Sequence, residues 1–315
     1  MFAARCLGVS LAVFISLYVF LSFAVSRAWR RFLRVLSPAS AGGAADLLFF
    51  LRILPLALSS AFTLAITVPS FLLLEPHSTD EAIGTAPVTL GLCGIAFLAA
   101  GCVHATLAQR RTSRAIARWL GGSSVMDASG SVPVFRTADG APSFTVAGVC
   151  APRVLVSEAA VAVLTPSELR TALRHEVAHA RRHDNLKKLL FRLTVFPGMS
   201  ALEGEWSEQT EMAADDGAVS CFGDALDLAA ALIKVSRLSS LEPAGELTTA
   251  LLHSSTALSA RVHRLFNWDQ SLEPLTRRRS WWYLSTGATA MTVCFIVSYS
   301  SILTGMHTVT EWLVR

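Results

Sequence analysis

Four long apolar blocks interrupt an otherwise mixed chain, at residues 7–25, 53–74, 86–107 and 281–303. Each block is close to the length of about 20 residues that a helix needs to cross the hydrocarbon core of a bilayer. The first block also resembles a secretory signal peptide, but only Arg5 precedes it and a run of arginines begins directly after it, at Arg27. We therefore expect four membrane-spanning helices, the first of them retained.

The stretch between the third and fourth blocks has the pattern of a small soluble α+β domain. Three short runs rich in β-forming residues predict strands, at 132–136, 144–149 and 153–156. The chain then offers a strong helix start, with Thr165 as N-cap, Pro166 in the first turn and Glu168 three residues after the cap. An apolar stripe extends this predicted helix to about residue 183.

Together these patterns predict a membrane-integral, mainly α-helical fold in three parts. Residues 1–108 hold the first three spans, residues 109–280 form the soluble α+β domain, and residues 281–315 hold the fourth span and a short tail. The glycine- and serine-containing stretch 121–130 is typical of a linker or turn between the third span and the soluble domain, and residues 226–238 have the pattern of another helix.

The composition agrees with a membrane protein. Of the 315 residues, 52% are hydrophobic and 16% are charged, whereas about a quarter are charged in ordinary soluble proteins. This excludes a disordered chain and a plain soluble enzyme. The basic clusters that give the net charge of +4 flank the apolar blocks, and the short loop 75–85 is acidic. By the positive-inside rule, residues 109–280 are cytoplasmic and both termini lie outside.

The helix that starts at Thr165 carries the candidate chemistry, in the order His175, Glu176, Val177, Ala178, His179. Two histidines four residues apart lie about 40° apart around a helix and one turn apart along it, so both imidazoles can bind one zinc ion. Glu176 lies beside them and can act as general base on a zinc-bound water. The chain has no C-x-x-C pair, which argues against a cysteine zinc site.

A catalytic zinc ion needs a third protein ligand and an open position. The metzincin pattern would place a histidine ten residues after His175, but that position is Asn185, so this class is excluded. His183 lies one turn further along the same helix, where a straight helix reaches a shared ion poorly. The remaining candidate is an acid from a later helix, either Glu211 or, one turn earlier, Glu208.

The helix motif, followed about thirty residues later by Glu-x-x-Ala-Asp at 211–215, resembles the gluzincin pattern of integral-membrane metallopeptidases. Two families share this pattern: the BlaR/MecR-type antibiotic-sensor peptidases and, more distantly, the HtpX/CAAX prenyl protease type. The chain is more similar to the BlaR/MecR type. Residues 152–156 before the helix and 181–184 after it match that pattern, as does the order of three spans, a cytoplasmic zinc domain and a fourth span.

This resemblance implies a zincin-like metallopeptidase domain with Zn²⁺ bound by His175, His179 and Glu211. It implies that Glu176 is the catalytic base. It also implies that Asp215, one turn after Glu211, hydrogen-bonds a ligand histidine and fixes its tautomer.

Three further residues have weaker implied roles. Asp184 matches the acid that follows the helix motif in the family, where its role is structural or supports a ligand. Arg261 and His263 lie in a segment that resembles the one closing the zinc domain in related peptidases. They would stabilise the oxyanion of the reaction or belong to a structural helix. The antibiotic sensors of this family also carry a penicillin-binding domain after the fourth span. Nothing comparable follows here, so sensing of β-lactams through such a domain is not expected.

The expected protein is therefore an enzyme, a zinc endopeptidase embedded in a bacterial-type inner membrane. Its substrate would be a protein cut as a regulatory step: a cytoplasmic repressor, another membrane protein or the chain itself. Two alternatives stay open, a protease for quality control of membrane proteins and a non-catalytic zinc-fold protein that binds a partner. The lipid bilayer is a partner in each case, and direct contact with nucleic acid is not expected.

Overall fold

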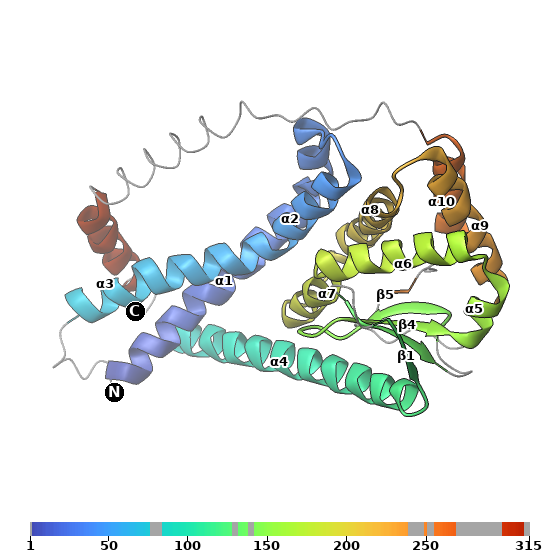
Figure 1. Cartoon of the computed structure of the whole chain (residues 1–315). Coiled ribbons are helices and arrows are strands. Elements are labelled where there is room, and N and C mark those ends of the chain that lie inside the picture. The colour runs from blue at the N-terminus through green and yellow to red at the C-terminus, as the bar shows by residue number, and fades with distance from the viewer. Residues whose placement is uncertain are drawn as a thin grey trace. The chain divides into compact units, whose positions relative to one another are not determined.

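The computed structural model describes residues 2–75, 84–127, 132–137, 142–238, 249–250, 255–268 and 298–311 (Figure 1). These residues are mainly helical, with a small mixed sheet. The chain divides into two compact units. We call the first the membrane unit, which comprises Met1–Arg30, Leu51–Ala100 and Leu275–Arg315, and the second the site unit, which comprises Arg31–Phe50 and Gly101–Pro274.

Among the described residues, three helices are long and apolar enough to cross a membrane, and they contain the first three predicted spans. They are α1 (Phe2–Leu36), the continuous run of α2 (Ala41–Phe62), the π-helix η1 (Thr63–Thr67) and α3 (Val68–Leu74), and α4 (Thr85–Leu120). Both α1 and α4 continue beyond their apolar blocks through arginine-containing turns, because arginine is a good helix former. The predicted fourth span, 281–303, falls mostly outside the described residues, although residues 298–311 are helical.

Small residues and one buried ion pair hold the membrane unit together. A Cβ added at Gly91 of α4 would lie 3.0 Å from the carbonyl oxygen of Gly8 in α1, so the two backbones approach closely. Arg5, near the start of α1, makes a buried ion pair of 2.9 Å with Glu75, directly after α3. The His307 ring of the last described helix lies 3.8 Å from the other oxygen of Glu75.

In the part of the chain that the structure describes, the sheet of the site unit has the strand order β1-β2-β4-β3-β5. The strands β2 and β4 are parallel and the other neighbours are antiparallel. Their bounds are β1 (Ser124–Asp127), β2 (Val134–Thr137), β3 (Phe144–Ala147), β4 (Arg153–Ser157) and β5 (Thr249–Ala250). The three predicted strands are confirmed. The predicted linker or turn at 121–130 holds at 121–123, where the chain turns after α4, and 128–130 lie outside the described residues. Residues 124–127 differ, because they form β1, an exposed edge strand without the buried alternation that predicts one.

Six helices complete the site unit: α5 (Glu158–Val163), α6 (Pro166–Arg181), α7 (Asp184–Leu193), α8 (Ser200–Ala218), α9 (Phe222–Leu238) and α10 (Ser255–Phe266). The predicted helix at 226–238 is confirmed as α9. Helix α6 packs against α8, α9 and β3. Its apolar face contributes to one core with the sheet and α9, which includes Val146, Val154, Leu228 and Leu232. The central position of α6 places its buried residues between the sheet and two helices.

The predicted capping box at the start of α6 is confirmed. The hydroxyl of Thr165 accepts a hydrogen bond from the backbone N–H of Glu168, whose carboxylate accepts one from the N–H of Thr165. Lys234 of α9 lies 2.8 Å from the same carboxylate. Burial opposes ionisation of Glu168, but Lys234 and Thr165 outweigh it and lower its pKa. The box therefore also ties α6 to α9.

Replacing Thr165 with alanine should lower the free energy of unfolding by about 1 kcal/mol, because an N-cap hydroxyl is lost. Thr165→Ser keeps the hydroxyl and should stay close to wild type. Chemical unfolding of the full chain in detergent measures both variants. Equal stability of the alanine and serine variants would contradict the role of the cap.

The predicted end of this helix, at about 183, is wrong by two residues. Helix α6 ends at Arg181, and His183 has a left-handed backbone with φ of 55°. The chain turns there and α7 begins at Asp184. This turn brings Asp184 back against the last turn of α6, where His179 lies.

Candidate metal site

The motif residues of α6 are completely removed from solvent. His175 and Glu176 are 0% exposed and His179 is 1% exposed. All three point away from the solvent, which is unusual because ionisable groups are seldom fully buried without partners. The motif residues are therefore not solvent-facing charges of an amphipathic helix, and their contacts inside the protein indicate their role.

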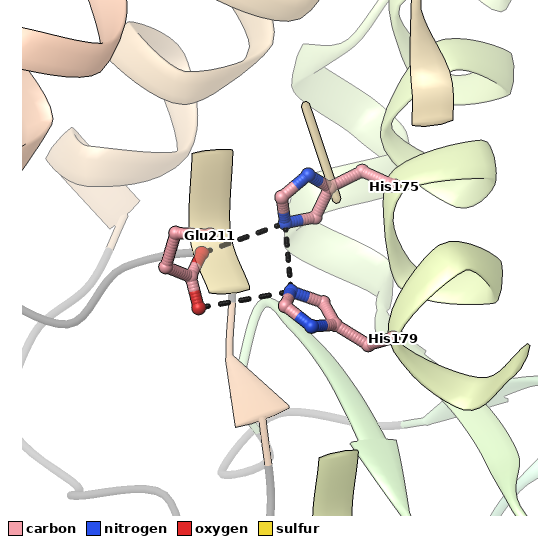
Figure 2. A group of neighbouring side chains, drawn as sticks. All are labelled: His175, His179 and Glu211. Atoms are coloured by element: carbon pink, nitrogen blue, oxygen red, sulfur yellow. Dashed lines mark hydrogen bonds and ion pairs between the residues drawn. The ribbon is translucent and has the colours of Figure 1, made fainter. Parts of the chain in front are cut away.

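Helix α8 brings Glu211 to the two histidines (Figure 2). Its Oε2 lies 3.6 Å from Nε2 of His175, and its Oε1 lies 3.6 Å from Nε2 of His179. One ligand atom from each of the three residues lies within 4.8 Å of the others. This buried group of two imidazoles and one carboxylate could hold a metal ion.

Two further carboxylates lie on the opposite side of the imidazole rings. Nδ1 of His175 lies 3.0 Å from Oδ1 of Asp215, and Nδ1 of His179 lies 2.8 Å from Oδ2 of Asp184. An ionised carboxylate only accepts hydrogen bonds, so Nδ1 of His179 is the protonated nitrogen of its ring. The 3.0 Å approach of Asp215 favours the same tautomer for His175, although this contact lacks hydrogen-bond geometry. The Nε2 atoms are then the acceptors, and their lone pairs face the centre of the group.

The two Nε2 atoms lie only 3.1 Å apart and both face the carboxylate of Glu211. Two acceptor nitrogens and an anion at these distances repel one another unless a proton or a metal ion lies between them. Histidine ligands whose other nitrogen donates to a carboxylate are the usual arrangement in protein zinc sites. The donor atoms of His175, His179 and Glu211 thus fit a bound cation.

Arg261 of α10 holds the acidic residues of α8 in place. Its Nη1 donates to Glu211 over 2.9 Å, while its Nε and Nη2 donate to the two oxygens of Asp215 over 2.9 and 2.6 Å. The residue is 4% exposed. Of the two roles expected for Arg261, these contacts favour the structural one. His263 is exposed and contacts Asn267, so it does not face the site.

The charges of this group strongly change the pKa values of its members. Burial opposes ionisation of Glu211, but His179 and Arg261 outweigh it and hold the pKa of Glu211 well below its usual range. Burial likewise opposes protonation of His179, but Glu211 and Asp184 outweigh it and raise its pKa to about 10. Asp215 and Glu211 raise the pKa of His175 against the same effect of burial. Without a metal ion, the group therefore holds a proton at neutral pH.

Glu176 differs from the ligand candidate Glu211 because no described residue hydrogen-bonds its carboxylate. Both of its carboxylate oxygens are buried and have no hydrogen-bond partner among the described residues. Burial raises the pKa of Glu176, against the lowering effect of His175 and His179. A buried carboxylate with two unsatisfied oxygens beside a cation site is suited to accept a proton from a small ligand bound there.

Sequence reasoning missed one cation near the site, Lys188. Burial lowers the pKa of Lys188, against the opposite effect of Glu211, Asp184 and Glu176. Its charge thus acts on three carboxylates of the site. The sequence spacing could have placed Lys188 near Asp184, because the two residues are four apart and lie on the same face of α7.

The structure separates the other candidates for a third ligand. Glu208 and His183 are both exposed, and neither belongs to the buried group. Asn185, at the position where a metzincin has its third histidine, donates hydrogen bonds to the carbonyl oxygens of Val146 and Gly148 at the end of β3. It joins α7 to the sheet.

Zinc binding at pH 7 should release about one proton per site, since a ligand imidazole must be neutral and the metal-free group holds a proton up to a pKa of about 10. Because that pKa is raised, protons compete with the metal at neutral pH. The logarithm of the affinity should therefore rise by about one for each pH unit between about 7 and 9. Calorimetry in buffers of different ionisation enthalpy measures the released proton. Binding without proton release would contradict the raised pKa of His179 in the metal-free chain.

Comparison with known proteins adds no family to this geometry. No family model matches the chain, and no curated protein matches it significantly.

Proposed function

We propose that this protein is a membrane-embedded zinc endopeptidase that cuts a protein as a regulatory step. One observation carries the proposal: the buried group of His175, His179 and Glu211 lies beside Glu176, whose buried carboxylate has no hydrogen-bond partner among the described residues. The resemblance of the same residues to the BlaR/MecR-type pattern supports it.

Zinc is the ion that fits the donor set best. Two imidazoles and one carboxylate are a ligand set of catalytic zinc sites, in which the fourth position stays open. Asp215 and Asp184 would fix the two imidazole rings, and Arg261 would fix Glu211. Calcium and magnesium prefer oxygen ligands and fit this set less well.

A zinc ion bound there would polarise the scissile carbonyl and lower the pKa of a bound water toward 7. The residues of the chain do the rest. Glu176 takes the proton of the attacking water on one of its free oxygens and passes it to the leaving nitrogen. Glu211 stays ionised, held by Arg261, and balances the charge of the cation.

The edge of the sheet suggests how a peptide would bind. Thr249 and Ala250 of β5 pair antiparallel with Val146 and Thr145 of β3, and β5 also contacts α6 (Figure 1). This edge therefore accepts an extended segment next to the helix that carries the motif. Because the segment is part of the same chain, this pairing favours the chain itself among the expected substrates.

The membrane unit supports the proposed topology. The expected arrangement places the N-terminus, the loop after residue 74 and the C-terminus on the same, outer side. Arg5, Glu75 and His307 come from these three places and lie together within the membrane unit. We propose that the site unit lies on the cytoplasmic side, where its flanking arginines would meet anionic lipid headgroups.

The test is a cleavage assay with the full chain in detergent. Zinc-loaded protein should cut itself or added casein, and a chelator should stop the reaction. Mass spectrometry of the fragments distinguishes the two kinds of protease. A few cleavage sites within the chain itself indicate a regulatory peptidase, and many cleavage sites in casein indicate a quality-control protease. Zinc-loaded protein that cuts neither substrate would favour a non-catalytic protein that binds a partner.

A further inference from the structure

The first turns of α2 lie against both helices that carry the candidate ligands, within the site unit. A Cβ added at Gly42 would lie 3.1 Å from Nη1 of Arg182 and 3.9 Å from Cβ of Ala213. Arg182 caps the C-terminal end of α6, and Ala213 follows Glu211 by two residues on α8. The backbone of α2 at Gly42 therefore lies close to Arg182 and within ordinary contact distance of α8.

An aromatic series makes a second connection between α2 and α8. The ring of Phe49 lies 5.7 Å from that of Phe191 in α7, and Phe191 lies 4.9 Å from Trp206, edge to face. Trp206 is 2% exposed and precedes Glu211 on α8 by five residues. The start of α2 thus packs on the helices of the site through apolar as well as polar contacts.

A series of charged groups runs from α2 to one of the ligands. Oδ1 of Asp46 lies 3.0 Å from Nη2 of Arg182 and 3.1 Å from Nζ of Lys187. The same Nζ lies 3.7 Å from Oδ1 of Asp184. The other oxygen of Asp184 lies 2.8 Å from Nδ1 of His179.

Burial makes Lys187 important for the orientation of Asp184. Oδ1 of Asp184 is buried and has no hydrogen-bond partner among the described residues, and the ammonium of Lys187 lies 3.7 Å from it. The charge of the buried Lys188 also acts on Asp184. The side chain of Lys187 is 15% exposed, and Asp46 and the ring of Phe49, 5.5 Å away, restrict its position. Loss of the Lys187 ammonium would therefore weaken the hold on the oxygen of Asp184 that does not contact the imidazole.

We propose that Asp46 and Lys187 are positioning residues for the metal site. Asp46 holds Lys187, Lys187 orients the carboxylate of Asp184, and Asp184 orients the ring of His179. The inference rests on the proposed metal site and adds a control of that site by α2. Because α2 continues to Phe62 as part of the second candidate span, these contacts link a ligand to a membrane helix.

Binding of Co²⁺ to the full chain in detergent tests the proposal, since its visible absorption reports the ligand geometry. Asp46→Asn and Lys187→Met should each weaken Co²⁺ binding by about threefold to tenfold and change the spectrum. Asp184→Asn should weaken it by about 10- to 100-fold, as expected for a group bonded directly to a ligand histidine. Lys187→Arg keeps the charge and should restore binding to within about twofold of wild type.

Lys234→Met is the matched control, because it also breaks an ion pair between a lysine and an acid. That acid is Glu168 in the first turn of α6, seven residues before His175. This substitution should leave both affinity and spectrum unchanged. Wild-type affinity and spectrum in Asp46→Asn and Lys187→Met would overturn the inference and leave the metal site intact. An equal loss in Lys234→Met would also overturn it, since the effect would then be general. A wild-type chain that binds no Co²⁺ or Zn²⁺ would refute the proposed function itself.

Discussion

Replacing Glu176 with glutamine should lower the rate of peptide cleavage by about 10²- to 10⁴-fold, the usual contribution of a general base. Glutamine has nearly the same shape but cannot accept the proton of the attacking water. The metal content should not change, because Glu176 is not among the three residues whose ligand atoms converge. The cleavage assay and the zinc content of the same preparation measure the two effects.

Glu208→Gln is the control for this substitution. Glu208 lies on α8 one turn before Glu211, but it is exposed and outside the buried group. Its replacement should leave both activity and zinc content at the wild-type values. A Glu176→Gln chain that cleaves at the wild-type rate would remove Glu176 from the proposed mechanism.

Replacing Arg261 with methionine should lower the free energy of unfolding of the metal-free chain by about 3–5 kcal/mol. The substitution leaves the carboxylates of Glu211 and Asp215 buried without their shared cation. Breaking one side of a buried ion pair is strongly destabilising for this reason. Added zinc should restore part of the loss, because it binds the folded state and supplies positive charge beside Glu211.

Chemical unfolding of the full chain in detergent, with and without a chelator, measures this effect. Arg264→Met serves as control. Arg264 follows Arg261 by three residues on α10 and pairs with Asp216 at the surface. An exposed pair of this kind should contribute less than about 1 kcal/mol. Should Arg261→Met fail to fold, Arg261→Lys can be measured in its place. It keeps the charge but loses the guanidinium fork, so its free energy of unfolding should be lower than that of both wild type and Arg264→Met. Equal stabilities of Arg261→Met and Arg264→Met would contradict the structural role of Arg261.

The elements that could be predicted from the sequence are those with strong local signals. The start of α6 combines a cap, a proline and a glutamate within four residues, and the structure confirms it. The three spans are long apolar runs, and three strands have β-rich patterns between turns. By contrast, β1 has four exposed residues and owes its position to pairing with β2, which local patterns do not encode.

The partners of the site residues depended on contacts between distant parts of the chain. The spacing of Glu211 and Asp215 places both on one face of α8, so their approach to the histidines could be expected. The bond from Asp184 to His179 depends on the left-handed turn at His183, which the sequence did not predict. The contacts of Arg261 lie 46 and 50 residues away in the chain, and a single sequence carries no signal for them.

The zinc content of the purified full chain tests the central claim most directly. Wild type and Glu176→Ala should each hold about one zinc ion per chain after reloading and removal of free metal. Glu211→Ala, which removes the carboxylate between the two imidazoles, should hold far less while remaining folded by circular dichroism. A wild-type chain that holds no zinc, or a Glu211→Ala chain that holds as much as wild type, would contradict a zinc site formed by His175, His179 and Glu211.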